Sequence, residues 1–124
     1  MKILAISGSL KSTSKNSILV RAIGTLVPEG WQYTIYNGLD DLPHFSPERD
    51  IEPAPEAVQK LRSSLKAADA VLICTPEYAH GMPGSLKNAL DWTVSSGEFV
   101  GKPVAVLSAS PSMLGGDKAH AGLV

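Results

Sequence analysis

The sequence predicts an α/β fold with a doubly wound parallel sheet. Four apolar runs alternate with amphipathic helical patterns along 124 residues, and strands that alternate with helices in this way form parallel sheets. The run at 70–74 is apolar at every position, as expected of a central strand that is buried on both faces. Polar loops follow the first, third and fourth runs. We therefore expect these three loops to meet at the carboxyl end of the sheet, where ligands of such folds bind.

Chain length and composition predict one domain, over residues 1–124, and disfavour several classes of partner. Hydrophobic residues make up 44% and charged residues 19% of the chain, and the formal net charge is −1. This charge provides no field to attract nucleic acid or an acidic membrane surface. Cys74 is the only cysteine, so we expect no disulfide and a reducing, cytoplasmic location. The apolar run before Ser7 is too short for a signal peptide or a membrane span.

The first strand is expected at 3–6, and the loop at 7–17 that follows it is rich in hydroxyl groups. It holds five Ser, one Thr and two Lys and precedes a helical pattern formed by Ile18, Leu19, Ala22, Ile23 and Leu26. The amino end of a helix has unpaired N–H groups that attract anions. The loop lacks the spacing of dinucleotide-binding and P-loop motifs, which favours a terminal monophosphate. In a second interpretation, Asn16 or Ser17 merely caps the helix.

The remaining elements follow from apolar periodicity. An alternating strand is expected at 31–36, and the proline-rich loop at 37–55 is long enough to be a functional flap or a tolerated insertion. Glu56 begins a helix with Val58, Leu61, Leu65 and Ala68 on one stripe. After the strand at 70–74 and its loop, a helix is expected at 85–94. A last strand at 104–107 leads into a small-residue loop at 108–116.

Two motifs resemble those of the NADPH-dependent FMN reductase family. The first is Gly8-Ser9-Leu10-Lys11 … Ser14 … Asn16-Ser17. The second runs Leu72-Ile73-Cys74-Thr75-Pro76-Glu77-Tyr78 … Pro83-Gly84-Ser85-Leu86-Lys87-Asn88-Ala89-Leu90-Asp91-Trp92 and is too specific to arise from composition. The resemblance covers essentially the whole chain. It implies a flavodoxin-like fold and a family that includes flavin, quinone and chromate reductases and some azoreductases.

The resemblance also implies an FMN site made by the three polar loops. The residues that would hold the FMN phosphate are Ser9, Lys11, Ser14, Asn16 and Ser17. Those that would lie against the isoalloxazine ring are Pro76, Glu77, Tyr78 and Gly81, and those near its pyrimidine edge are Ser110, Gly115 and Gly116. Ala79 and His80 would face the substrate, where they replace a usual Asn and a variable residue. Lys11 stands where the family usually has Arg, which keeps the charge but loses the bidentate fork.

The implied activity is hydride transfer from NADPH or NADH, through FMN, to a flavin, quinone or similar small acceptor. The two transfers would occur in succession. The flavin carries this chemistry, so no catalytic side chain is required, and the three histidines lack the spacing of a metal site. The resemblance further implies a homodimer or homotetramer, with no nucleic-acid or membrane partner.

Two other functions remain open from the sequence. Family members continue with a further strand and helix, so we expect the carboxyl-terminal strand and helix to be missing from a truncated flavodoxin-like domain. A non-catalytic remnant with weak or no FMN binding is therefore one alternative, and a flavodoxin-type electron carrier is the other. The helical motif at 84–92 and the small net charge disfavour the carrier.

Several motif residues also have purely structural interpretations. Trp92 would pack in the core or at a subunit contact, and Cys74 would be a small core residue. Lys87, Asn88 and Asp91 would pair with one another along the helix or cap the turn. Glu77 would hold its loop or a neighbouring subunit rather than transfer a proton.

Overall fold

Four parallel strands form one sheet with the order β2-β1-β3-β4 in the computed structural model, which describes residues 1–109 and 116–124. The strands are β1 (Lys2–Ser7), β2 (Gln32–Tyr36), β3 (Ala70–Cys74) and β4 (Val104–Leu107). The helices are α1 (Lys15–Gly24), α2 (Glu56–Ala67), α3 (Gly84–Asp91) and α4 (Asp117–Leu123), with short 3₁₀ turns η1 (Leu39–Asp41) and η2 (Pro47–Arg49). This confirms the predicted doubly wound parallel sheet.

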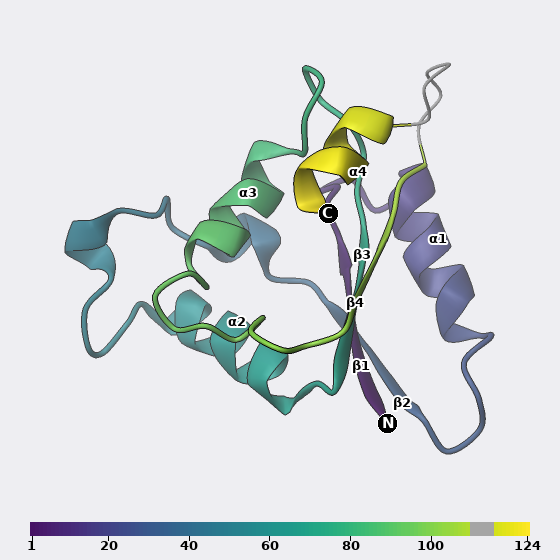
Figure 1. The fold of residues 1–124 in the computed structure, drawn as a ribbon, viewed down its shortest axis with the longest axis horizontal. Coiled ribbons are helices and arrows are strands. Elements are labelled where there is room, and N and C mark those ends of the chain that lie inside the picture. Colours follow the sequence, from purple (N-terminus) through teal and green to yellow (C-terminus); the bar gives the residue numbers. More distant parts are fainter. Residues whose placement is uncertain (110–115) are drawn as a thin grey trace.

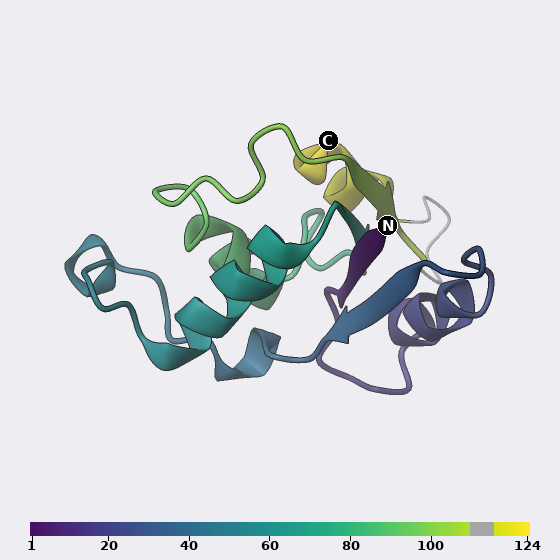
Figure 2. The same cartoon turned by 90° about the horizontal axis from the view of Figure 1, so that it is seen from below.

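Helices cover both faces of the sheet, with α1 on one face and α2 and α3 on the other (Figures 1 and 2). Strand side chains alternate between these faces. Leu4 and Ile6 of β1 belong to the cluster on the α2 and α3 face, whereas Ala5 between them packs with Val20 of α1. β3 alternates likewise and is buried from residue 71 to 74. The sheet therefore has a hydrophobic core on each face, as the continuous apolar run at 70–74 predicts.

The sequence prediction is accurate for α2 and less so for α1. Helix α2 begins at Glu56, and its predicted stripe is buried. In α1, by contrast, Leu19 and Ile23 of the predicted stripe pack against the core beside the buried Val20, but Ile18 is 51% and Leu26 is 79% exposed. The Tyr33 hydroxyl donates to the Val20 carbonyl, and a Cβ added to Gly24 would lie 2.8 Å from the Tyr33 ring. Close packing against this ring therefore holds the side of α1 that carries Val20 and Gly24 near β2.

Helix α3 ends at Asp91, before the predicted end at residue 94. The Trp92 carbonyl accepts hydrogen bonds from Nη2 and Nε of Arg62, at 2.8 and 3.1 Å. The residue that follows the helix is thus held by Arg62 of α2, a contact that the local sequence does not reveal.

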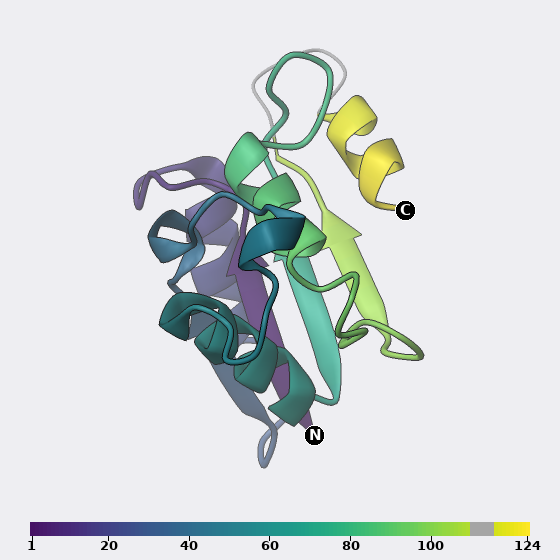
Figure 3. The ribbon, with the colours of Figure 1, turned by 90° about the vertical axis from the view of Figure 1, so that its left-hand side faces the viewer.

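Strand β4 lies at one edge of the sheet and is its least buried strand (Figure 3). Val104 is 41% and Leu107 is 40% exposed. Within the two described ranges, no helix combines the length and the apolar character that crossing a bilayer requires.

Candidate functional site

The three polar loops are here called the serine loop (residues 7–17), the β3 loop (75–83) and the β4 loop (108–116). They lie at the carboxyl ends of β1, β3 and β4, where chain connections diverge to the two sides of the sheet. The Gly8 N–H donates to the Cys74 carbonyl at 2.7 Å. A Cβ added to Gly8 would lie 3.1 Å from Thr75 Oγ1 and 3.3 Å from Pro76 Cδ. The serine loop and the β3 loop are therefore in direct contact, as predicted.

The serine loop carries a set of unused backbone donors. Within residues 1–109 and 116–124, no acceptor is found for the N–H groups of Leu10, Ser12, Thr13, Lys15 and Asn16. Asn16 is only 1% exposed, and buried N–H groups are nearly always paired in folded proteins. Lys15 and Asn16 also form the first turn of α1, where the helix dipole is positive. An anion would satisfy these donors.

The charges around the serine loop agree with this interpretation. The first turn of α1 contains no acidic residue and begins with Lys15, which opposes the helix dipole. Lys11, Lys15 and Arg21 form no ion pair with any described residue. Sequence reasoning did not select Lys15, although a cation in the first turn of a helix is a signal for an anion site.

The serine hydroxyls mainly hold the loop itself. Ser14 is the N-cap of α1, and its hydroxyl accepts the Ser17 N–H at 3.1 Å. The second interpretation, which named Asn16 or Ser17 as the cap, is therefore wrong. Ser17 is buried, and its hydroxyl contacts those of Ser7 and Ser14 and donates to the Lys11 carbonyl. Ser9 accepts the Lys11 N–H. This network gives the loop a fixed shape.

Asn16 connects the serine loop to the end of β4. Its Nδ2 donates to the Ala109 carbonyl at 2.8 Å, and its Oδ1 accepts the Ala109 N–H at 3.0 Å. Ser108 adds a bond from its hydroxyl to the Thr75 carbonyl at 2.7 Å. Residues 108–109 therefore contact both the serine loop and the start of the β3 loop. A direct contact between the Asn16 side chain and a ligand stays a prediction.

The β3 loop contains a tight turn with two residues in the left-handed region. Tyr78 and Gly81 exchange both backbone hydrogen bonds, at 2.8 and 3.0 Å. Between them, Ala79 and His80 have φ values of 51° and 61°. Two-residue turns of this kind favour Asn followed by Gly, because other residues are strained there. Tyr78 is 56% exposed beside this turn, so the tip presents three exposed side chains to solvent.

Glu77 connects the β3 loop to α4. Its Oε1 accepts the Ala119 N–H at 3.0 Å, in agreement with the interpretation of Glu77 as a residue that holds its loop. Gly116, at the N-cap of α4, is buried with φ 81°. Of the other predicted site residues, Ser110 and Gly115 lie outside the described residues.

Most polar groups of the helical motif serve the fold. Asn88 and Trp92 both donate to the Pro43 carbonyl, at 3.0 and 2.8 Å, and Asn88 also accepts the Phe45 N–H. The expected pairing is confirmed for Lys87 with Asp91 at 2.5 Å, but it is wrong for Asn88. Trp92 is fully buried, as one structural interpretation predicted. This motif therefore fixes the long loop rather than a ligand.

Cys74 is a core residue at the end of β3, also as predicted. Its side chain is fully buried, and this burial raises the pKa of its thiol to about 11. The thiol therefore stays protonated at neutral pH, and Cys74 is not a nucleophile. No group of acidic, histidine or cysteine side chains within the described ranges is arranged to hold a metal ion.

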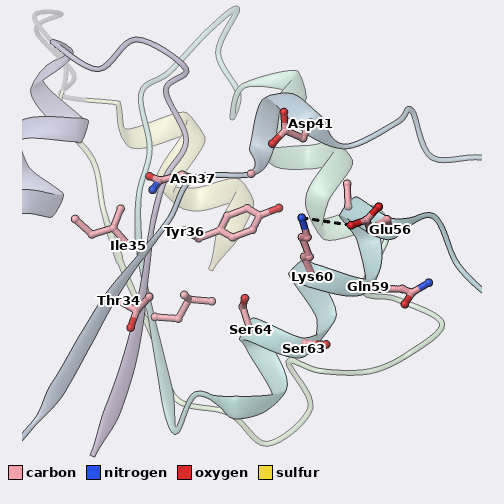
Figure 4. A pocket seen from close by; sticks show the side chains of 13 residues that line it. Thr34, Ile35, Tyr36, Asn37, Asp41, Glu56, Gln59, Lys60, Ser63 and Ser64 are labelled. Carbon is pink, nitrogen blue, oxygen red and sulfur yellow. Dashed lines mark ion pairs between the residues drawn. The ribbon is translucent and has the colours of Figure 1, made fainter.

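A cavity of about 930 Å³ lies between β2 and α2, away from the three loops. Figure 4 shows Tyr36, Lys60 and Glu56 around it, with the lysine paired to the glutamate at 3.6 Å. Burial, with a smaller contribution from Asp41, raises the pKa of Tyr36 to about 12. A smaller cavity of about 410 Å³ lies beside the serine loop and is lined by Ser9, Ser12 and Arg21 among others. Only this second cavity adjoins the predicted phosphate site.

Fold and site together define a flavodoxin-like α/β protein with a hydroxyl-rich loop and free backbone donors, among the described residues, at the switch point of its sheet. The chain belongs to the NADPH-dependent FMN reductase family, whose sequence model matches residues 1–124. An NAD(P)H-dependent FMN reductase of Pseudomonas aeruginosa is 40% identical over 122 residues, which are 97% of this chain and 65% of that protein. An NADPH azoreductase of Bacillus sp. is 38% identical over 130 residues, with 99% and 68% covered.

The solved structures agree with this assignment. FerB, a flavoenzyme NAD(P)H:(acceptor) oxidoreductase from Paracoccus denitrificans, superimposes with a TM-score of 0.88 at 34% identity, covering 98% of this chain and 68% of FerB. An FMN-dependent NADH-azoreductase of Bacillus anthracis, solved with FMN, shares the fold with a TM-score of 0.66 at 16% identity, covering 99% and 79%. The chain spans about two thirds of the length of the curated relatives described above.

Proposed function

We propose that residues 1–124 form the flavin-binding domain of an NAD(P)H-dependent oxidoreductase that uses FMN to reduce a small acceptor, such as a flavin or a quinone. The observation that carries this proposal is the set of five N–H groups in the serine loop that have no acceptor among residues 1–109 and 116–124, accompanied by Lys11 and Lys15. Family membership, with relatives named as flavin, quinone and azo reductases, supports it.

The serine loop suits the single phosphate group of FMN. A phosphate monoester carries up to two negative charges and three acceptor oxygens, which match several backbone donors and two ammonium groups. We propose that the predicted loop residues Ser9, Lys11, Ser14, Asn16 and Ser17 form this phosphate site, with Lys15 added. The hydroxyl network around Ser17 holds the backbone donors in place before a ligand binds, which lowers the entropic cost of binding.

The β3 loop is proposed to receive the ring. We propose, from the family resemblance, that Pro76, Glu77, Tyr78 and Gly81 lie against the isoalloxazine and that Ser110, Gly115 and Gly116 lie at its pyrimidine edge. Bound FMN would supply the hydride carrier. The chain would bind and orient the reactants, and the exposed side chains of Ala79 and His80 would face the acceptor.

Absorbance and turnover measurements on the purified whole protein test this proposal. We expect a flavin spectrum after incubation with FMN, and consumption of NADPH or NADH when FMN or a quinone is supplied. Comparison of the two nicotinamides and of several acceptors would define the specificity. A protein that stays colourless and inert with both nicotinamides would contradict the proposal and favour the non-catalytic alternative.

A homodimer or homotetramer in the cytoplasm is part of the same proposal. Val94 and Val100, which follow α3, are 80% and 84% exposed, so they could be covered by a second subunit. The buried, protonated thiol of Cys74 is compatible with a reducing compartment. Sedimentation equilibrium measures the oligomeric state directly, and a monomer at all concentrations would remove this part of the proposal.

A further inference from the structure

Asn16 and Ala109 are 93 residues apart and form two reciprocal hydrogen bonds. The amide of Asn16 donates to and accepts from the backbone of Ala109, and the residue is 1% exposed. Replacing such a buried side chain leaves backbone groups unpaired, which is costly. The contact joins the first turn of α1, where the anion would bind, to the end of β4.

Glu77 makes a similar connection on the other side. The N-cap of α4 is Gly116, which has no side chain to cap the helix. The carboxylate of Glu77 bonds the Ala119 N–H instead, at 3.0 Å, and so replaces the missing cap from another loop. Ala109 and Ala119 stand on either side of residues 110–115 in the sequence. The serine loop and the β3 loop therefore each bond the backbone on one flank of the β4 loop.

We propose that Asn16 and Glu77 are positioning residues, which hold Ala109 and Ala119 against the other two loops and so keep the walls of the flavin site together. Neither side chain needs to touch the ligand. Asn16 offers its backbone N–H to the phosphate while its side chain is bonded to Ala109. This inference rests on the proposed function, and it replaces the expected phosphate contact of the Asn16 side chain with a structural contact between loops.

Riboflavin has the ring of FMN but no phosphate. Its binding therefore distinguishes a positioning role of Asn16 from a direct contact of its side chain with the phosphate. A positioning residue should affect both flavins, so N16A should weaken FMN and riboflavin by a similar factor of about ten, the value of one or two lost hydrogen bonds. The matched control is K11M, which removes a charge from the phosphate site and should weaken FMN about tenfold without affecting riboflavin. Fluorescence titration measures all four affinities.

Two results would overturn the role of Asn16. Weaker binding of FMN with unchanged riboflavin binding would make its side chain a direct phosphate ligand. Unchanged binding of both flavins would show that the contact with Ala109 has no effect on the site. If N16A does not fold, N16D retains the size of the side chain and is titrated with riboflavin, which has no phosphate for the new carboxylate to repel.

The role of Glu77 is tested by comparing E77A, which removes the hydrogen-bond acceptor, with E77Q, which keeps one. E77Q keeps an oxygen that accepts the Ala119 N–H, so it should retain wild-type flavin affinity, whereas E77A should weaken both flavins severalfold. An equal loss in E77Q and E77A would show that the negative charge matters and would contradict positioning through this bond.

Amide hydrogen exchange separates this inference from the proposed function. The Ala109 N–H should exchange slowly in the wild-type protein and faster in N16A, while amides in α2 remain unchanged. Rapid exchange of Ala109 in the wild-type protein would refute the bond itself. A wild-type protein that protects Ala109 but binds neither flavin would refute the proposed function, and with it the role of both residues at a flavin site.

Discussion

The serine loop and the layer formed by α2 and α3 differ in how completely their polar groups are paired. In the helix layer, Arg62 bonds the Trp92 carbonyl and Asp50, and its guanidinium carbon lies 5.9 Å from the centre of the Trp92 ring. In the serine loop, by contrast, five N–H groups and two lysines have no partner among the described residues. A fully paired region maintains the fold, whereas unpaired donors at a helix start are available to a ligand.

The largest effect is expected from W92A. Trp92 is fully buried, bonds the Pro43 carbonyl and packs edge-on against Phe45 with ring centres 5.1 Å apart. Its loss should lower the free energy of unfolding by about 3–5 kcal/mol, measured by urea denaturation. W92F should lose less, because most of the ring volume remains. A small loss in W92A would mean that the helical motif does not maintain the fold.

G8A tests the junction between the serine loop and the β3 loop. The added methyl group would meet Thr75, Leu86 and Pro76 at 3.1–3.3 Å, so we expect a loss of about 1–3 kcal/mol in unfolding free energy. Because the two loops must separate, FMN affinity should fall as well. G101A has open space for its methyl group but a positive φ, so it controls for backbone strain without crowding. Wild-type FMN affinity in G8A would show that the two loops need not touch.

K15E should separate stability from binding. A glutamate in the first turn of α1 agrees with the helix dipole, so the unfolding free energy should rise by about 0.3–1 kcal/mol. FMN affinity should fall about tenfold or more, because an anion would then meet a negative charge. Thermal denaturation and fluorescence titration measure the two changes. Higher stability together with weaker FMN binding is the result expected if Lys15 lowers the stability of α1 but favours the bound anion. Tighter FMN binding in K15E would contradict the anion site.

A79G should relieve strain at the tip of the β3 loop. Ala79 has φ 51°, and an L-residue in this region costs about 1–2 kcal/mol. Part of the gain is offset by the greater freedom of glycine in the unfolded chain, so we expect a net stabilisation of about 0.5–1 kcal/mol. If the strained turn places Tyr78 for the flavin ring, FMN affinity should fall at the same time. A destabilised A79G would show that the turn is relaxed.

The smallest expected effect is a pH dependence of the unfolding free energy, caused by Asp50 beside the layer formed by α2 and α3. Hydrogen bonds from Ser95, at 2.5 Å, and from Arg62, at 3.0 Å, hold the pKa of Asp50 below its usual value of 3.8. A lowered folded-state pKa contributes stability above the unfolded value, and this is lost as the pH falls through the folded value. Unfolding free energy should therefore decline below about pH 4. D50N should show a shallower decline, and an identical pH profile would contradict the assignment.

Much of the fold was determined by local sequence. The continuous apolar run at 70–74 and the stripe of α2 reflect burial on two faces and on one face, and the strand and the helix start where the pattern starts. The serine loop was predicted from its position after a strand and before a helix, together with its hydroxyl groups and lysines. These features depend on side-chain periodicity and on unpaired groups at a helix end, which exist before any tertiary contact forms.

Other features were decided only by tertiary contacts. Tyr33 bonds the Val20 carbonyl of α1, and Arg62 bonds the carbonyl of the residue that follows α3. Likewise, Asn16 was assigned to a ligand from its place in the motif, but it bonds a residue 93 positions away. One side chain cannot reveal a distant partner, because the same amide suits a phosphate and a backbone equally well. The sequence thus selected the candidate loops, and contacts among the described residues decided which atoms of these loops are already paired.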